Sequence, residues 1–186
     1  TLERVIGGGT TSLDSAFPNG GAVGTLGLES IGALAANGES FVFASRCYLV
    51  RVSGGSYSFE AGSPDCTGGL HELGDGPSLE LPFRVGPDAV AVHPGGAIYA
   101  VYKERLYRIN RGRYELVTIL SEPILDVAVS AGVVYALGGH LIAGGSRTFG
   151  VWRVGNTGSV TLVTQLPSTE DDQYYGLQAM GRGPKG

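Results

Sequence analysis

Short runs of alternating apolar and polar residues, separated by glycine-containing turns, extend along most of the chain. Three segments repeat one order: a small-apolar run, an aromatic-apolar run, and a run that ends in an apolar-Arg-apolar triplet. The segments begin at Gly32, Asp88 and Asp126, and a fourth run follows each of them, at 56–61, 114–120 and 159–166. Alternation with a period of two, interrupted by glycine turns, is typical of antiparallel β-strands.

Four strands per repeat are typical of β-propeller blades, whose inner strands carry small side chains because blades crowd toward the central axis. We therefore predict an all-β fold of propeller blades with four antiparallel strands each, an incomplete propeller that is a fragment of a larger one. Its predicted parts are an outer strand of a preceding blade (1–8), three blades (31–62, 88–120 and 124–166) and an inner strand of a following blade (175–180). Propellers close with about four to eight blades, so we expect either a longer polypeptide or a ring of several copies.

The composition argues against several functional classes. A formal net charge of −4 and a pI near 5.3 disfavour a nucleic-acid partner, which needs a basic surface to neutralise phosphates. No apolar run approaches the roughly 20 residues of a membrane span. The sequence starts with Thr1 rather than Met and shows no signal peptide, so we expect a processed product or an excerpt of a longer protein.

The two cysteines are predicted to lie on the same face of the first blade. Cys47 falls in the loop between the second and third strands, and Cys66 falls in the connector that leads to the next blade. Pairing across the turn at 53–56 places Cys47 near Gly62, so the Cα separation suits the ~5.5 Å of a disulfide. A disulfide would indicate an oxidising compartment, whereas the alternative is two unpaired thiols in a cytosolic protein.

The stretch 74–83, followed by Pro-Asp-Ala-Val-Ala-Val-His-Pro-Gly-Gly-Ala-Ile-Tyr-Ala at 87–100, resembles the NHL-repeat family of β-propellers. A weaker copy of the same glycine-rich connector and inner hairpin runs over 20–36. The chain departs from the family where an Asp often follows the second strand, because the residues near that place are Ser45, Tyr102 and Gly138. The resemblance implies protein-interaction platforms, recognition modules of large extracellular proteins, or metal-assisted hydrolases and lyases.

Histidines and acidic residues are predicted to gather on the face that carries these loops and connectors. The candidate ligands of a divalent cation are His71, Asp75, Asp88, Asp126 and His140, the last of which lies in a predicted connector loop at 138–148. Carboxylate and imidazole groups suit such an ion, and Ca²⁺ is the cofactor of the alternative function given below. However, no fixed ligand spacing appears, and an Asp at the start of a strand is commonly a turn residue that bonds to the backbone.

Three arginines, Arg51, Arg108 and Arg153, occupy the same position in the three repeats. We interpret them as structural groups that bind carbonyls or acids between adjacent blades, with a ring of anion-binding groups as the alternative. No nucleophile elbow, phosphate-binding loop or dinucleotide-binding motif is present in the sequence. The sequence therefore predicts no catalytic residue.

These observations favour a non-enzymatic propeller scaffold or binding module of a larger secreted or cell-surface bacterial protein, with a periplasmic location as a variant. The expected partner is a protein or the remainder of the same polypeptide, with self-association through open blade edges as a further option. Neither nucleic acid nor a membrane span is expected. The alternative is part of a Ca²⁺-dependent propeller hydrolase or lyase that resembles the gluconolactonase-like enzymes.

Overall fold

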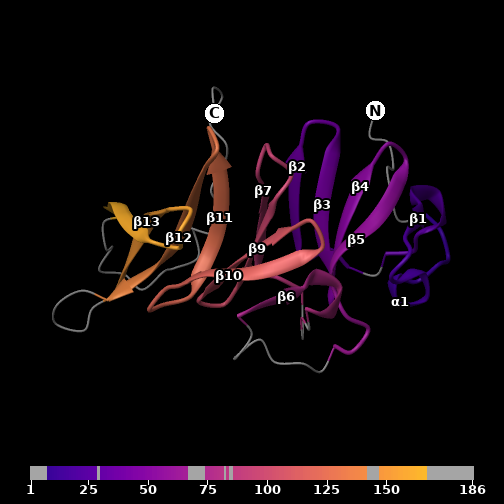
Figure 1. Cartoon of the computed structure of the whole chain (residues 1–186), viewed down its shortest axis with the longest axis horizontal. Coiled ribbons are helices and arrows are strands. Elements are labelled where there is room, and N and C mark those ends of the chain that lie inside the picture. The colour runs from indigo at the N-terminus through magenta and orange to yellow at the C-terminus, as the bar shows by residue number, and fades with distance from the viewer. Residues whose placement is uncertain are drawn as a thin grey trace. The chain divides into compact units, whose positions relative to one another are not determined.

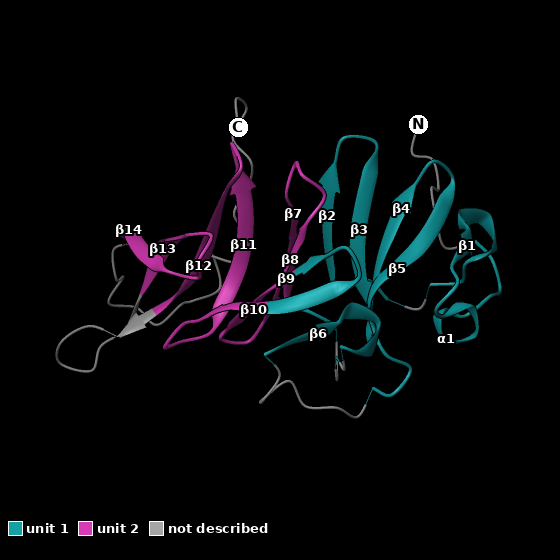
Figure 2. Cartoon of the chain, viewed as in Figure 1, with its two compact units in different colours: residues 1–87, 109–115 teal, residues 88–108, 116–186 magenta. Residues whose placement is uncertain are grey.

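The computed structural model describes residues 8–28, 30–66, 74–81, 83, 86–141 and 147–166 (Figure 1). The chain divides into two compact units, one of residues 1–87 with 109–115 and the other of 88–108 with 116–186 (Figure 2). Three antiparallel sheets contain nearly all of the described elements. Among the described residues, no helix is long and apolar enough to cross a membrane.

The first sheet has the order β1-β5-β4-β3-β2, so four of its strands form a simple meander. The meander strands are β2 (Ala33–Asn37), β3 (Ser40–Ser45), β4 (Tyr48–Ser53) and β5 (Ser56–Gly62). Two-residue turns join them, and both central residues of the β4–β5 turn, Gly54 and Gly55, have positive φ values of 56° and 77°. Turns of this kind match the twist of an antiparallel hairpin and favour glycine.

A short connector strand adds a fifth member to each of the first two sheets. In the first sheet β1 (Gly21–Ala22) pairs with β5, and in the second sheet β6 (Asp75–Pro77) pairs with β10. Each connector strand continues into a 3-10 turn, η1 (Val23–Thr25) or η3 (Ser78–Glu80), and then into a fully buried leucine, Leu26 or Leu81. The connector is therefore part of the repeat.

One face of the first sheet is covered by the segment that contains helix α1 (Leu13–Ala16). The cluster beneath this segment is built from α1, Leu26 and the aromatic residues of three strands. Phe59 lies at its centre, with ring centroids 5.1 Å from Phe17, 5.3 Å from Tyr48 and 6.1 Å from Tyr57. Mutual edge-on contacts of this kind stabilise a core beyond the area that they bury.

The second sheet has the order β6-β10-β9-β8-β7, and the third has the order β11-β12-β13-β14. The strands of the second meander are β7 (Ala89–Val92), β8 (Ile98–Tyr102), β9 (Arg105–Asn110) and β10 (Arg113–Ile119). Those of the third are β11 (Ile124–Ser130), β12 (Val133–Leu141), β13 (Arg147–Val154) and β14 (Val160–Leu166). The division between the two units passes through the second sheet.

The core of the second unit lies where β11 packs against β7 and β8. It combines small residues of β7 with Tyr99 and Val101 of β8, and with Val127, Val134 and Ala136 of the third sheet. Ala91 and Tyr99 lie opposite each other across β7 and β8 and are 6% and 8% exposed. The apolar face of one meander is thus covered by the inner strand of the next.

The structure confirms the prediction of an all-β fold of four-stranded antiparallel units, and the described strands begin and end within a few residues of the predicted runs. Helix α1 and the two connector strands were not predicted. The third meander also differs, because β12 and β13 extend through 138–141 and 147–148, where the sequence predicted a connector loop. Except for Gly8, the predicted terminal strands 1–8 and 175–180 lie outside the described residues.

Candidate binding face

The loop between β3 and β4 is bonded covalently to the connector that follows β5. This loop consists of Arg46 and Cys47, and Cys47 forms a disulfide with Cys66, with 5.6 Å between their Cα atoms. Arg46 has a φ of 53°, so the loop holds a non-glycine residue in the left-handed region. The disulfide fixes the position of this strained loop relative to the residues that lead out of the sheet.

The equivalent loop of the second sheet, Lys103 and Glu104, is held by hydrogen bonds instead. The backbone N–H groups of Leu120 and Ile124 donate to the carbonyls of Glu104 and Lys103 over 2.9 and 2.8 Å. Lys103 has a φ of 56°, close to that of Arg46, and its Nζ lies 5.8 Å from the ring centroid of Tyr102. Both loops therefore present an exposed basic residue from a fixed backbone.

Helix α1 contributes a carboxylate to the first of these loops. Asp14 accepts hydrogen bonds from Arg46 Nη1 over 2.6 Å and from the Tyr48 hydroxyl over 2.7 Å. Burial of the ring, followed by the hydrogen bond to Asp14, raises the pKa of Tyr48 far above its usual value. Ser12 caps the helix by accepting from the N–H of Ser15. This cap is the one signal in the sequence that could have revealed α1.

The acidic candidates for a cation site already bind groups of the chain itself. Asp75 forms an exposed ion pair with Arg113, with Oδ2 3.2 Å from Nη2. Asp88 Oδ2 accepts from the backbone N–H of Lys103, and Asp126 Oδ1 accepts from the backbone N–H of Val127, both over 2.8 Å. Asp88 thus holds the backbone of another strand of its own sheet, and Asp126 holds the backbone of the next residue.

For the two histidine candidates, the structure describes at most the backbone. His71 lies outside the described residues. His140 was predicted in a loop, and this was wrong, because its backbone belongs to β12 and pairs with Thr148 of β13. Nothing among the described residues brings three or more His, Cys, Asp or Glu side chains together in a metal-binding group.

Of the repeated arginines, Arg51 has a partner in its own sheet. Its Nε lies 2.5 Å from Glu60 Oε1, and both side chains are partly buried. Arg153 lies across from Tyr135 and Thr161 in the third sheet and is exposed. The register places Arg51 between Val42 and Ser58 in the same way, so these two arginines occupy equivalent positions in their sheets.

His93, which lies in the turn between β7 and β8, has a role that the sequence did not predict. Its Nδ1 accepts from the N–H of Gly95 over 2.9 Å, so that nitrogen carries no proton. Its Nε2 then donates to the carbonyl of Gly132, 3.2 Å away in the β11–β12 turn. The side chain therefore joins the inner hairpins of two successive meanders.

No protein-family model and no curated protein sequence matches the chain. Among solved structures, the extracellular domain of a hybrid two-component system from B. thetaiotaomicron is similar with a TM-score of 0.47 and 10% identity over 74% of this chain. Apo AztD from Citrobacter koseri is similar with a TM-score of 0.43 and 10% identity over 79% of this chain. The chain covers 17% of the first structure and 38% of the second.

Proposed function

We propose that this chain is part of a non-enzymatic β-propeller scaffold in a larger secreted or cell-surface protein, where it binds a protein partner. In each of the first two meanders, the proposed binding face is the β3–β4 or the β8–β9 loop together with the connector bonded to it. The observation that carries this proposal is the fixation of both loops at the same place in the repeat, by the Cys47–Cys66 disulfide in one case and by two hydrogen bonds in the other.

The disulfide supports the proposed location. Structural disulfides persist in extracellular and periplasmic proteins, whereas cytosolic thiols are kept reduced. Cys47 is 2% exposed, whereas Cys66 is half-buried. The part of the chain that the structure describes contains no unpaired cysteine. We therefore expect the disulfide, and with it the geometry of this loop, to persist in a secreted or periplasmic protein.

The shared register supports the propeller arrangement. In each meander an inner-strand alanine, Ala35, Ala91 or Ala128, lies opposite a larger residue of the second strand, Val42, Tyr99 or Tyr135. Small residues on the innermost strand fit sheets that converge toward an axis, and larger residues fit where they diverge. This pattern, with its glycine-rich connector, supports membership of an NHL-like class of propellers.

The described carboxylates favour the scaffold over the Ca²⁺-dependent hydrolase or lyase. A calcium site needs several oxygen ligands directed at one point. Asp88 and Asp126 each use a carboxylate oxygen to hold the backbone of their own meander, and Asp75 pairs with Arg113. Calcium binding would have to compete with these contacts.

Site-specific photocrosslinking in the secreted, full-length protein tests the binding face. A benzophenone amino acid replaces Lys103 in the β8–β9 loop or, as the control, Arg111 in the turn at the opposite end of β9. Both positions are exposed, and their φ values of 56° and 51° impose similar strain. We expect a discrete adduct with one protein from Lys103 and none from Arg111. Equal labelling from both positions, or none from Lys103, contradicts the proposal.

A further inference from the structure

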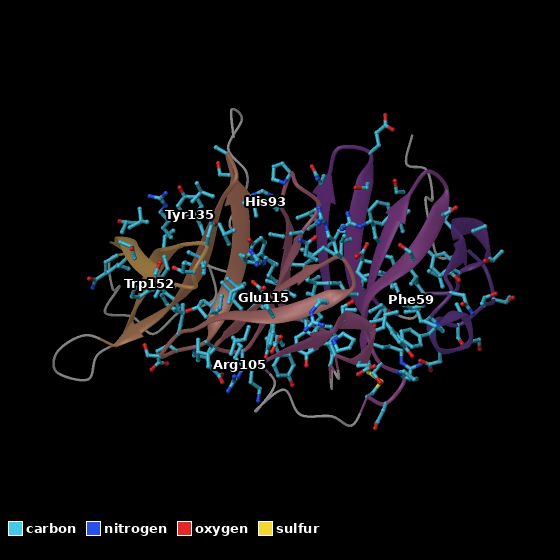
Figure 3. The ribbon with its side chains drawn as sticks, in the orientation of Figure 1. Phe59, His93, Arg105, Glu115, Tyr135 and Trp152 are labelled. Carbon is cyan, nitrogen blue, oxygen red and sulfur yellow. A yellow bond between two sulfur atoms is a disulfide. The ribbon has the colours of Figure 1, made fainter. Side chains whose placement is uncertain are left out.

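The third meander repeats a surface that the second meander keeps buried. Ala128 lies opposite Tyr135 across β11 and β12, in the register in which Ala91 lies opposite Tyr99 across β7 and β8. The same small–aromatic pair therefore stands at the same place on two successive sheets (Tyr135 is labelled in Figure 3).

On the second sheet this surface is covered. Strand β11 packs on β7 and β8 and places Val127 in one cluster with Ala91 and Tyr99, which are 6% and 8% exposed. Val127 and Val129 alternate with Ala128 along β11, so one side of that strand faces the second sheet while the other side carries the repeated pair.

On the third sheet the same surface is only partly covered. Ala128 and Tyr135 are half-buried, whereas the equivalent Ala91 and Tyr99 are buried. Arg153 is exposed although its counterpart Arg108 is half-buried, and Leu125 at the start of β11 is 37% exposed. A partly covered face with this repeated pattern is expected to receive the kind of element that covers it in the preceding repeat.

We propose that the face of the third sheet formed by Ala128, Tyr135 and Arg153 is a docking face for residues 175–180 of the same chain. This segment, Tyr-Gly-Leu-Gln-Ala-Met, alternates as β11 does, and Leu177 and Ala179 correspond to Val127 and Val129. The eight residues 167–174 connect it to the end of β14, whereas residues 120–123 suffice between β10 and β11. The inference rests on the propeller-type repeat of the proposed function.

Photocrosslinking inside the chain tests this docking, with the preceding repeat as a matched control. A benzophenone amino acid replaces Tyr135 or Tyr99 in the full-length protein, and mass spectrometry maps the adduct. From Tyr99 we expect adducts within 124–130, and from Tyr135 adducts within 175–180. An adduct of Tyr135 with another segment or with a second copy of the chain overturns the proposal. So does a Tyr135 variant without any adduct while the Tyr99 variant reacts.

Chemical access to Tyr135 provides a second readout. Nitration of Tyr135 by tetranitromethane should increase several-fold in Leu177→Asp, because the charge prevents this side from packing. The matched variant Gln178→Asp places the same charge on the opposite side of the strand and should leave nitration unchanged. Equal nitration in both variants overturns the docking. The loop-face crosslinking from Lys103 uses another surface, so failure of one proposal is distinguishable from failure of the other.

Discussion

The hydroxyl of Tyr48 donates a hydrogen bond to Asp14 Oδ1 over 2.7 Å, and this contact joins strand β4 to helix α1. Asp14 also forms an ion pair with Arg46 of the β3–β4 loop. One carboxylate therefore joins helix α1, strand β4 and this loop. The contact is buried on the tyrosine side, since Tyr48 is fully inaccessible. Several consequences for stability can be measured.

The first prediction concerns Tyr48 and pH. Its pKa is raised by burial and by Asp14, so the folded state favours the neutral phenol. The stabilisation is complete below about pH 10, the ordinary tyrosine pKa, and is lost as the pH rises above it. Tyr48→Phe should lower the free energy of unfolding by about 1–2 kcal/mol at pH 7. In urea titrations between pH 7 and 11, the free energy of unfolding of Tyr48→Phe should fall less steeply with pH than that of wild type. An equal fall in both proteins contradicts this role of Tyr48.

The second prediction concerns the disulfide. Closing a loop with a sequence separation of 19 residues should stabilise the fold by about 3 kcal/mol. Urea denaturation with and without reductant measures this difference. The double variant Cys47→Ser/Cys66→Ser should unfold like the reduced wild type and should not respond to reductant. Equal stability of oxidised and reduced wild type contradicts a structural role for the bond.

The third prediction separates a turn role for Asp88 from a calcium-binding role. Asp88→Ala removes the acceptor for the Lys103 N–H and should lower stability by about 1–2 kcal/mol. Asp88→Asn keeps an oxygen acceptor and should lower it less. Calcium titrations followed by calorimetry should show no difference between the variants and wild type. Stoichiometric calcium that is lost in both variants would instead favour the hydrolase or lyase alternative.

The fourth prediction compares two glycines with positive φ. A Cβ on Gly62, whose φ is 121°, would lie 2.3 Å from the carbonyl oxygen of Cys47, while a Cβ on Gly54 would meet no atom within 4 Å. Gly54→Ala should cost about 1 kcal/mol through backbone strain alone. Gly62→Ala should cost about 3 kcal/mol or more, because the disulfide-bonded loop must also move. Thermal unfolding of both variants checks the difference, and equal costs contradict it.

The strands were predictable because their signals are local. Period-two alternation and turn glycines locate β2 to β5 and β7 to β10 without knowledge of the tertiary fold. The Cys47–Cys66 disulfide was also predictable, because the hairpin register brings Cys47 close to Gly62. In the structure Gly62 pairs with Tyr48, the residue after Cys47. Helix α1 was missed because four residues are too few to display a helical period.

The extended third hairpin was missed because its glycines have a packing role. Gly138 and Gly139 resemble a turn in the sequence, yet they lie within β12 and pair with Gly150 and Phe149. A Cβ on Gly138 would lie 3.1 Å from Leu120, and one on Gly139 would lie 2.9 Å from the Glu122 side chain. These glycines admit the incoming connector, a tertiary contact that no local pattern reports.

The connector strands also bear on how the protein avoids forming fibrils. Exposed outer strands are templates on which further chains can grow, and β1 and β6 occupy that position beside β5 and β10. Among the described strands, β14 has no such companion, but the register shift between Val151 and Trp152 places a bulge in its pairing with β13. Bulges twist an edge away from flat stacking. Disrupting the pairing of β1 with β5 should therefore promote fibril growth, which thioflavin T fluorescence measures.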